Sequence, residues 1–115
     1  MGAVSFGKRK RIRFTGGEPL KEWQPSAGAA VYAVTYQQDP VGRPKSHSVV
    51  YFGETADLSK QFPAIREELR SWWENDGVAS GDLFVFYHEM PGSSQLEREN
   101  VQHQLVLEYE PRGNN

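Results

Sequence analysis

Cysteine is absent from this 115-residue chain, which excludes disulfide frameworks, zinc–thiolate centres and thiol-based catalysis. The chain also lacks an apolar run near the roughly 20 residues needed to cross a bilayer, and its N-terminus lacks the apolar segment of a signal peptide. Its length is that of one domain and is sufficient to bury a core without cross-links. We therefore expect a cytoplasmic protein that makes no membrane contact, while the sequence leaves the oligomeric state open.

Acidic residues are absent from the first 13 positions. Five basic side chains stand there: Lys8, Arg9, Lys10, Arg11 and Arg13. Of the 13 basic residues, eight are therefore left for residues 14–115, which hold all 15 acidic residues. A basic segment of this kind either contacts phosphates through counterion release or forms a solvated tail, and both interpretations stay open. The alternation over residues 11–14 also fits a short edge strand whose charges discourage edge-to-edge pairing.

Glycine, proline and charged residues punctuate residues 1–28, which we expect to form an N-terminal arm next to a domain over residues 29–115. Alternating apolar positions predict strands over residues 29–36 and 48–53. A polar stretch with two prolines and a glycine separates these runs. The two strands are therefore expected to pair antiparallel around a long loop.

The hydrophobic period changes after Asp57. Apolar residues recur at helical spacing, at Leu58, Phe62, Ile65, Leu69 and Trp72. Pro63 should kink or restart this helix, because proline lacks a backbone donor and clashes with the preceding turn. The sequence Asn-Asp-Gly at positions 75–77 should end it.

A third strand is predicted over residues 83–88, where apolar and aromatic residues predominate. Ser94 and Glu97 then form a capping-box pattern that begins a last helix, which extends to about Tyr109 and is ended by Pro111. The order is strand, strand, helix, strand, helix. It predicts an α+β fold in which helices flank a small three-stranded antiparallel sheet.

Two short tracts stand within the predicted strands, Ala30-Val31-Tyr32 and Tyr51-Phe52-Gly53. Together with residues 54–58 and the closing residues 111–114, they resemble the signature of the GIY-YIG endonuclease superfamily, in the family's order and near its spacing. The resemblance covers roughly residues 29–114. It implies the same strand and helix order, two tyrosines side by side on neighbouring strands, and a glycine at position 53 that lets backbone approach the substrate.

The chain departs from this signature at two charged positions. Gln61 stands where the family has an arginine, and Gln102 stands where the family has a metal-binding glutamate. The resemblance implies that a metal ion and an arginine meet most of the electrostatic demand of phosphodiester hydrolysis, because both stabilise charge in the transition state. A neutral amide is a weak ligand for Mg²⁺. We therefore expect lost catalysis and no cofactor, while Glu99, one turn before Gln102, is the alternative carboxylate for Mg²⁺ or Mn²⁺ if activity remains.

Three functions stay open for this pattern. The first is a non-catalytic GIY-YIG-like domain that binds DNA, RNA or another phosphate-containing ligand. The second is a weak metal-dependent phosphodiesterase or endonuclease, and the third is a protein-interaction module that keeps only the fold. The candidate binding residues are Tyr32, Tyr51, Arg98, Glu99 and Gln102, with Arg43 and Lys45 from the long loop.

Overall fold

The computed structural model describes residues 2–20, 22–25, 27–37, 47–76 and 83–114. Its elements are β1 (Gly2–Phe6), β2 (Ile12–Pro19), β3 (Ala30–Gln37), β4 (His47–Thr55), α1 (Leu58–Asp76), β5 (Leu83–Glu89), α2 (Gln95–Tyr109) and the 3-10 turn η1 (Arg112–Asn114). Neither helix in this described part of the chain combines the length and apolar composition that crossing a membrane would require.

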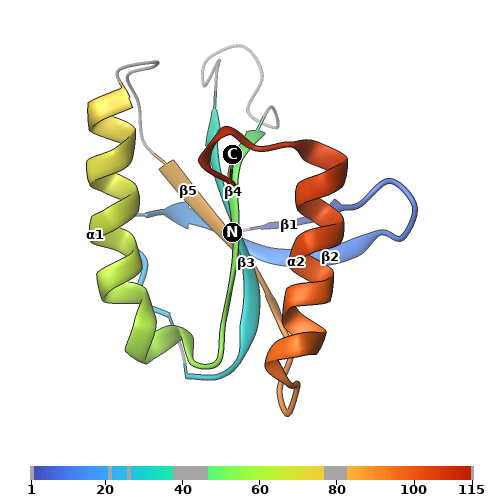
Figure 1. The fold of residues 1–115 in the computed structure, drawn as a ribbon. Coiled ribbons are helices and arrows are strands. Elements are labelled where there is room, and N and C mark those ends of the chain that lie inside the picture. The colour runs from blue at the N-terminus through green and yellow to red at the C-terminus, as the bar shows by residue number, and fades with distance from the viewer. Residues whose placement is uncertain (1, 21, 26, 38–46, 77–82, 115) are drawn as a thin grey trace.

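The strands form one antiparallel sheet in the order β1-β2-β5-β3-β4 (Figure 1). The α+β class is therefore confirmed, whereas the expectation of a three-stranded sheet is wrong. The segment expected to be an arm supplies two strands, because β2 pairs with the otherwise open edge of β5. Gly16 and Gly17, with φ values of 118° and 90°, allow the register shift in β2 that this pairing contains.

The remaining elements follow the sequence patterns closely. The strands expected over residues 29–36, 48–53 and 83–88 correspond to β3, β4 and β5. Helix α2 begins with the predicted capping box: the Glu97 amide donates to the Ser94 hydroxyl at 3.1 Å, and the Ser94 amide donates to the Glu97 carboxylate at 2.8 Å. Helix α1 includes Pro63 within its length and ends at Asp76, while Gly77 lies outside the described residues.

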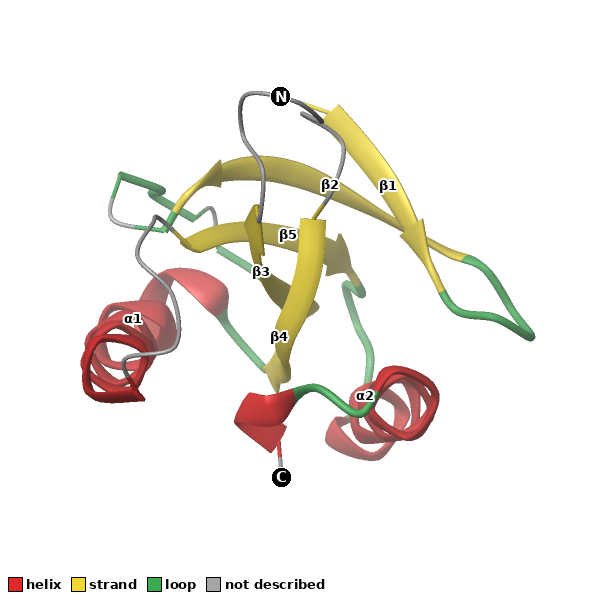
Figure 2. Ribbon diagram, turned by 90° about the horizontal axis from the view of Figure 1, so that it is seen from above, coloured by secondary structure: helices red, strands yellow, loops and turns green. Residues whose placement is uncertain are grey.

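Each face of the sheet is covered by one helix. Along β3, Tyr32 and Val34 pack with the buried residues of α1, whereas Val31 and Ala33 pack with Leu105 of α2. This alternation follows from the two-residue period of a strand. Figure 2 shows α1 and α2 on either side of β4, with η1 between them. The edge strand β4 is therefore the element at which both helices and the C-terminal turn meet.

Candidate functional site

Tyr32 and Tyr51, the two tyrosines of the resemblance, lie side by side on β3 and β4. Their ring centroids are 6.1 Å apart, with an interplanar angle of 41°. Tyr32 is only 2% exposed, whereas Tyr51 is half-buried at the rim of the core. Only Tyr51 therefore presents its ring to the surface.

Gly53 pairs with Tyr32 across the two strands. A Cβ atom at position 53 would lie 2.3 Å from both the Cζ and the hydroxyl oxygen of Tyr32. The space that other side chains would need is filled by the Tyr32 ring. In this structure the missing Cβ thus accommodates a buried side chain, where the resemblance implied an approach to substrate.

Both phenols are held in their neutral forms. Burial raises the pKa of Tyr32 far above its ordinary value, and proximity to Tyr51, a hydrogen bond between the two hydroxyls, and Glu54 and Glu68 raise it further. Burial also raises the pKa of Tyr51, which the hydrogen bond with Tyr32 partly offsets. Neither hydroxyl is suited to act as a general base near neutral pH.

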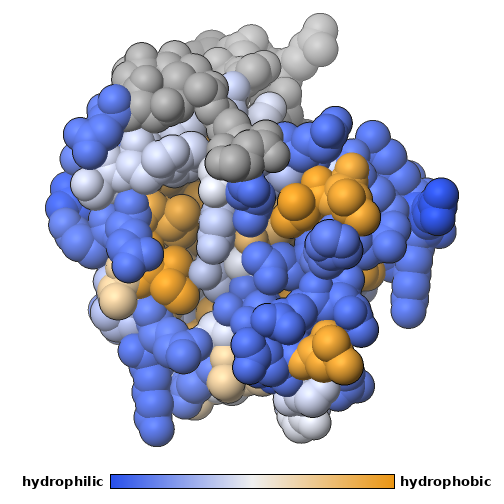
Figure 3. Space-filling model, in the orientation of Figure 1, coloured by the Kyte–Doolittle hydropathy of each residue, from blue (hydrophilic) through white to orange (hydrophobic). Residues whose placement is uncertain are grey.

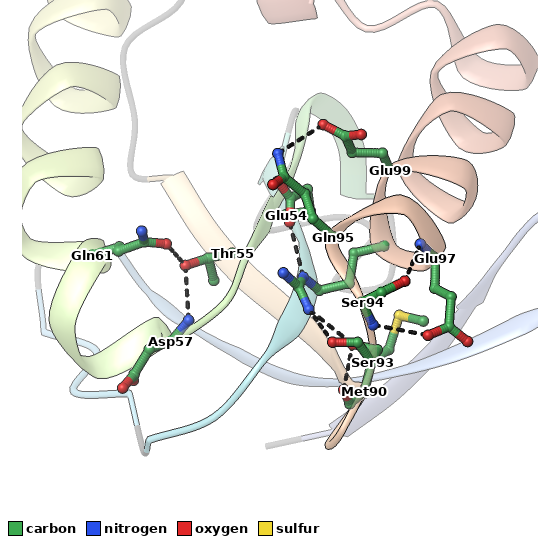
Figure 4. A network of polar contacts seen from close by, with 11 residues as sticks. Glu54, Thr55, Asp57, Gln61, Met90, Ser93, Ser94, Gln95, Glu97 and Glu99 are labelled. Atoms are coloured by element: carbon green, nitrogen blue, oxygen red, sulfur yellow. Dashed lines mark hydrogen bonds and ion pairs between the residues drawn. The ribbon is translucent and has the colours of Figure 1, made fainter.

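Gln61, which the resemblance would place at an arginine position, shapes the turn between β4 and α1. The Thr55 hydroxyl donates to the Gln61 side-chain oxygen, and the Asp57 amide donates to the Thr55 hydroxyl at 3.2 Å (Figure 4). The two arginines further along α1 do not replace the missing charge. Arg66 donates to the carbonyl of Trp23, and Arg70 pairs with glutamates of its own helix on the solvent side.

Gln102 and Asn114 both bind the backbone of Phe52 in β4. The Gln102 Nε2 and the Asn114 Nδ2 each donate to the Phe52 carbonyl at 2.9 Å, and the Phe52 amide donates to Asn114 Oδ1 at 2.8 Å. The amide of Asn114 thereby completes the hydrogen bonds that a neighbouring strand would make at this open edge. The Gln102 side chain, which the resemblance would align with a metal ligand, therefore holds the backbone of β4.

Arg98 forms a buried ion pair with Glu54. Its Nε donates to Glu54 Oε2 at 2.9 Å, and its side chain is only 6% exposed. A terminal nitrogen also donates to the carbonyl and hydroxyl of Ser93, at 2.7 and 3.0 Å. Figure 4 shows Glu54 and Ser93 converging on this point between β4 and the start of α2. Glu54 lies in the stretch that contributes to the family resemblance, but the sequence gives no sign that it pairs with Arg98, because the two residues are 44 positions apart.

Two surface depressions lie on either side of η1. The first, of about 180 Å³, is lined by Tyr51, Ile65, Glu68, Leu69, Trp72 and Gly113. The second is shallower, of about 320 Å³, and is lined by Glu99, Gln102, His103, Val106 and Asn114. The C-terminal turn thus separates Tyr51 from the predicted residues of α2. Glu68 is not among the residues predicted from the sequence, although its spacing from Ile65 and Trp72 places it on their helix face.

Glu99, the alternative carboxylate for a metal ion, stands alone on the surface of α2. Glu99 is exposed and accepts a hydrogen bond from Gln95 at 3.1 Å. Among the residues that the structure describes, no three histidine, aspartate or glutamate side chains are grouped to hold a metal ion. The Glu99 carboxylate is a single charged ligand, and the neighbouring Gln102 amide already donates to the Phe52 carbonyl. This pair does not suit Mg²⁺, which prefers an octahedral set of oxygen ligands. Arg43 and Lys45 lie outside the described residues.

Comparison with known proteins found no match to this chain among family models, curated proteins or solved structures.

Proposed function

We propose that this chain is a catalytically inactive GIY-YIG-like domain that binds nucleic acid, and that the contact is made by the β1–β2 hairpin. The observation that carries the proposal is the turn of this hairpin, where four consecutive basic side chains, Lys8, Arg9, Lys10 and Arg11, are all exposed. Clustered cations of this kind supply sequence-independent attraction to phosphates. Arg13 adds a fifth exposed cation on β2.

The hairpin turn is fixed to the end of α2. The Gly7 amide donates to the Tyr109 hydroxyl at 2.8 Å, and the Lys8 amide donates to Glu108 at 2.7 Å. The hydrogen bond from Lys8 lowers the pKa of Glu108, so this carboxylate stays ionised and keeps its contact at neutral pH. The turn extends beyond α2, on the side away from α1 (Figure 1). A preordered basic turn binds phosphates at a smaller entropic cost than a free tail.

A contact between the β1–β2 hairpin and phosphates predicts a specific salt dependence of binding. Arg9→Gln with Lys10→Gln should weaken binding to duplex DNA or single-stranded RNA on the order of tenfold at low salt. On duplex DNA it should also reduce the salt slope by about 0.9 for each phosphate that the protein no longer neutralises. Gel-shift titrations at several salt concentrations measure both quantities. Lys60→Gln with Arg70→Gln is the matched control, because it removes one lysine and one arginine from α1.

The control pair should leave both quantities nearly unchanged. Equal weakening by the two pairs would contradict a hairpin contact. If the natural protein shows no salt-dependent binding at low ionic strength, the nucleic-acid proposal itself is wrong. That result would favour the alternative of a protein-interaction module.

The proposed lack of catalysis is tested by nicking of supercoiled and branched DNA with Mg²⁺ or Mn²⁺. We expect no metal-dependent cleavage, because both tyrosines are neutral and no charge replaces the family's arginine. Gln61→Arg with Gln102→Glu should also fail to restore activity, since a carboxylate at position 102 would face the Phe52 carbonyl that the amide now binds. Cleavage by the natural protein contradicts the proposal; cleavage by the double variant alone would show that the site is vestigial yet repairable.

A further inference from the structure

A small pocket opens between α1, β4 and η1, and we call it the Tyr51–Trp72 pocket. Tyr51 comes from β4, Trp72 and Glu68 from α1, and Gly113 from η1. Hydrophobic surface is visible between α1 and the centre of the molecule, surrounded by hydrophilic surface (Figure 3). The pocket therefore combines apolar walls with a carboxylate at its border.

The rings of Tyr51 and Trp72 both come close to Gly113. A Cβ atom at that glycine would lie 3.2 Å from Tyr51 Cδ1 and 3.3 Å from Trp72 Cη2. The absence of a side chain thus keeps both rings close to the C-terminal turn. Aromatic faces carry negative charge density and attract cations placed near them, and tryptophan is the strongest of the aromatic side chains in this respect.

Among the described residues that line the pocket, Glu68 is the one with a charged side chain. Glu68 is exposed and forms no hydrogen bond or ion pair with any residue in the described part of the chain. The arginines of the same helix are used elsewhere, since Arg70 pairs with Glu67 and Glu74 while Arg66 donates to Trp23. Glu68 also contributes to the raised pKa values of both tyrosines. A phosphate would be repelled here, whereas a cation would find a free counter-charge.

We propose that the Tyr51–Trp72 pocket binds the side chain of a lysine from a protein partner. The ammonium group pairs with Glu68 and lies against Tyr51 and Trp72, and the hydrocarbon stem lies against Ile65 and Leu69. A volume of about 180 Å³ is suited to a single side chain. The proposal extends beyond nucleic-acid binding, because it uses α1 and an acidic surface where the hairpin contact uses β1, β2 and basic residues.

The test is an NMR titration of the isotope-labelled full chain with N-acetyl-lysine-N-methylamide as the probe. We expect saturable shifts at the Gly113 amide and the Trp72 indole. The norleucine analogue, which keeps the four-carbon stem but lacks the ammonium group, should bind at least about tenfold more weakly. Glu68→Gln should weaken lysine binding by about tenfold, whereas Glu74→Gln, which removes a carboxylate outside the pocket, should leave it unchanged.

Several outcomes would overturn this proposal. One is the absence of saturable shifts, and another is equal binding of the lysine and norleucine probes. A third is binding of N-acetyl-glutamate or inorganic phosphate at the same residues, strengthened by Glu68→Gln. Tyr51→Phe keeps the ring and should retain binding, so that the test does not depend on a larger substitution in the core. Arg9→Gln with Lys10→Gln should leave this titration unchanged, which separates it from the nucleic-acid experiment.

Discussion

Replacement of Gly53 by alanine is expected to lower the free energy of unfolding by about 3 kcal/mol. The new Cβ would lie 2.3 Å from Tyr32 Cζ and from its hydroxyl oxygen, well inside van der Waals contact. Tyr32 has little room to move, because it is buried and its ring is flanked by those of Tyr51 and Phe62, with centroids at 6.1 and 5.7 Å. The clash must therefore displace either the ring or the strand pairing of β3 and β4. Urea unfolding at equilibrium measures the loss.

A second substitution separates this clash from other effects of the alanine. Tyr32→Leu removes the ring atoms that meet the new Cβ, although it leaves a cavity in the core. In that background Gly53→Ala should cost about 2 kcal/mol less than in the natural protein, which a double-mutant cycle reports as a coupling energy. If alanine is tolerated in the natural protein, or is equally costly in both backgrounds, the packing of Tyr32 over Gly53 is not what selects glycine.

Replacement of Arg98 by alanine is expected to lower the free energy of unfolding by about 3 kcal/mol. Removal of the guanidinium leaves Glu54 partly buried without its counter-charge, and leaves the Ser93 carbonyl without this donor. An unpaired buried charge costs several times more than an exposed pair contributes. Thermal or urea unfolding at neutral pH measures the difference.

The double variant Arg98→Met with Glu54→Leu supplies the control for charge. It removes both ions together and keeps apolar volume, so most of the lost stability should return. Arg70→Ala provides a second control, because its pairs with Glu67 and Glu74 are exposed and the change should stay within about 0.5 kcal/mol. An Arg98→Ala protein as stable as the Arg70→Ala protein would show that the buried pair contributes nothing.

Both substitutions disturb contacts of β4. On β4, Gly53 accommodates Tyr32, Glu54 holds Arg98, and the Phe52 backbone binds Gln102 and Asn114. Positions that the family signature would assign to chemistry are engaged here in packing or hydrogen bonds. A strand at the edge of a sheet needs such partners, because its outer backbone groups are otherwise unpaired. In the described part of the chain, we propose the basic hairpin and the Tyr51–Trp72 pocket as the binding surfaces.

Local patterns in the sequence are enough to predict β3, β4, β5 and α2. Alternation, turn residues and the capping box at Ser94 and Glu97 act within a few residues, so they can be recognised without knowing the fold. Helix α1 is likewise predicted from a local pattern, the helical spacing of its apolar residues. Its apolar stripe marks the face that packs on the sheet, although Pro63 predicts a kink or a restart where the structure has one helix from Leu58 to Asp76.

The tertiary structure alone decided which distant residues meet. The basic and glycine-rich composition of residues 1–28 predicts an arm, and the alternation over residues 11–14 fits at most a short edge strand. Neither pattern indicates that β2 lies inside the sheet, paired with β1 on one side and β5 on the other. Likewise, Arg98 is a binding candidate until its partner Glu54 is known, and Glu68 is an ordinary helix residue until Tyr51 and Gly113 lie beside it. By itself the sequence determined β3, β4, β5 and the two helices, because their signals are short-range in the chain. Strand partners, ion pairs and pockets depend on contacts between residues far apart in sequence, and only the folded chain brings those side chains together.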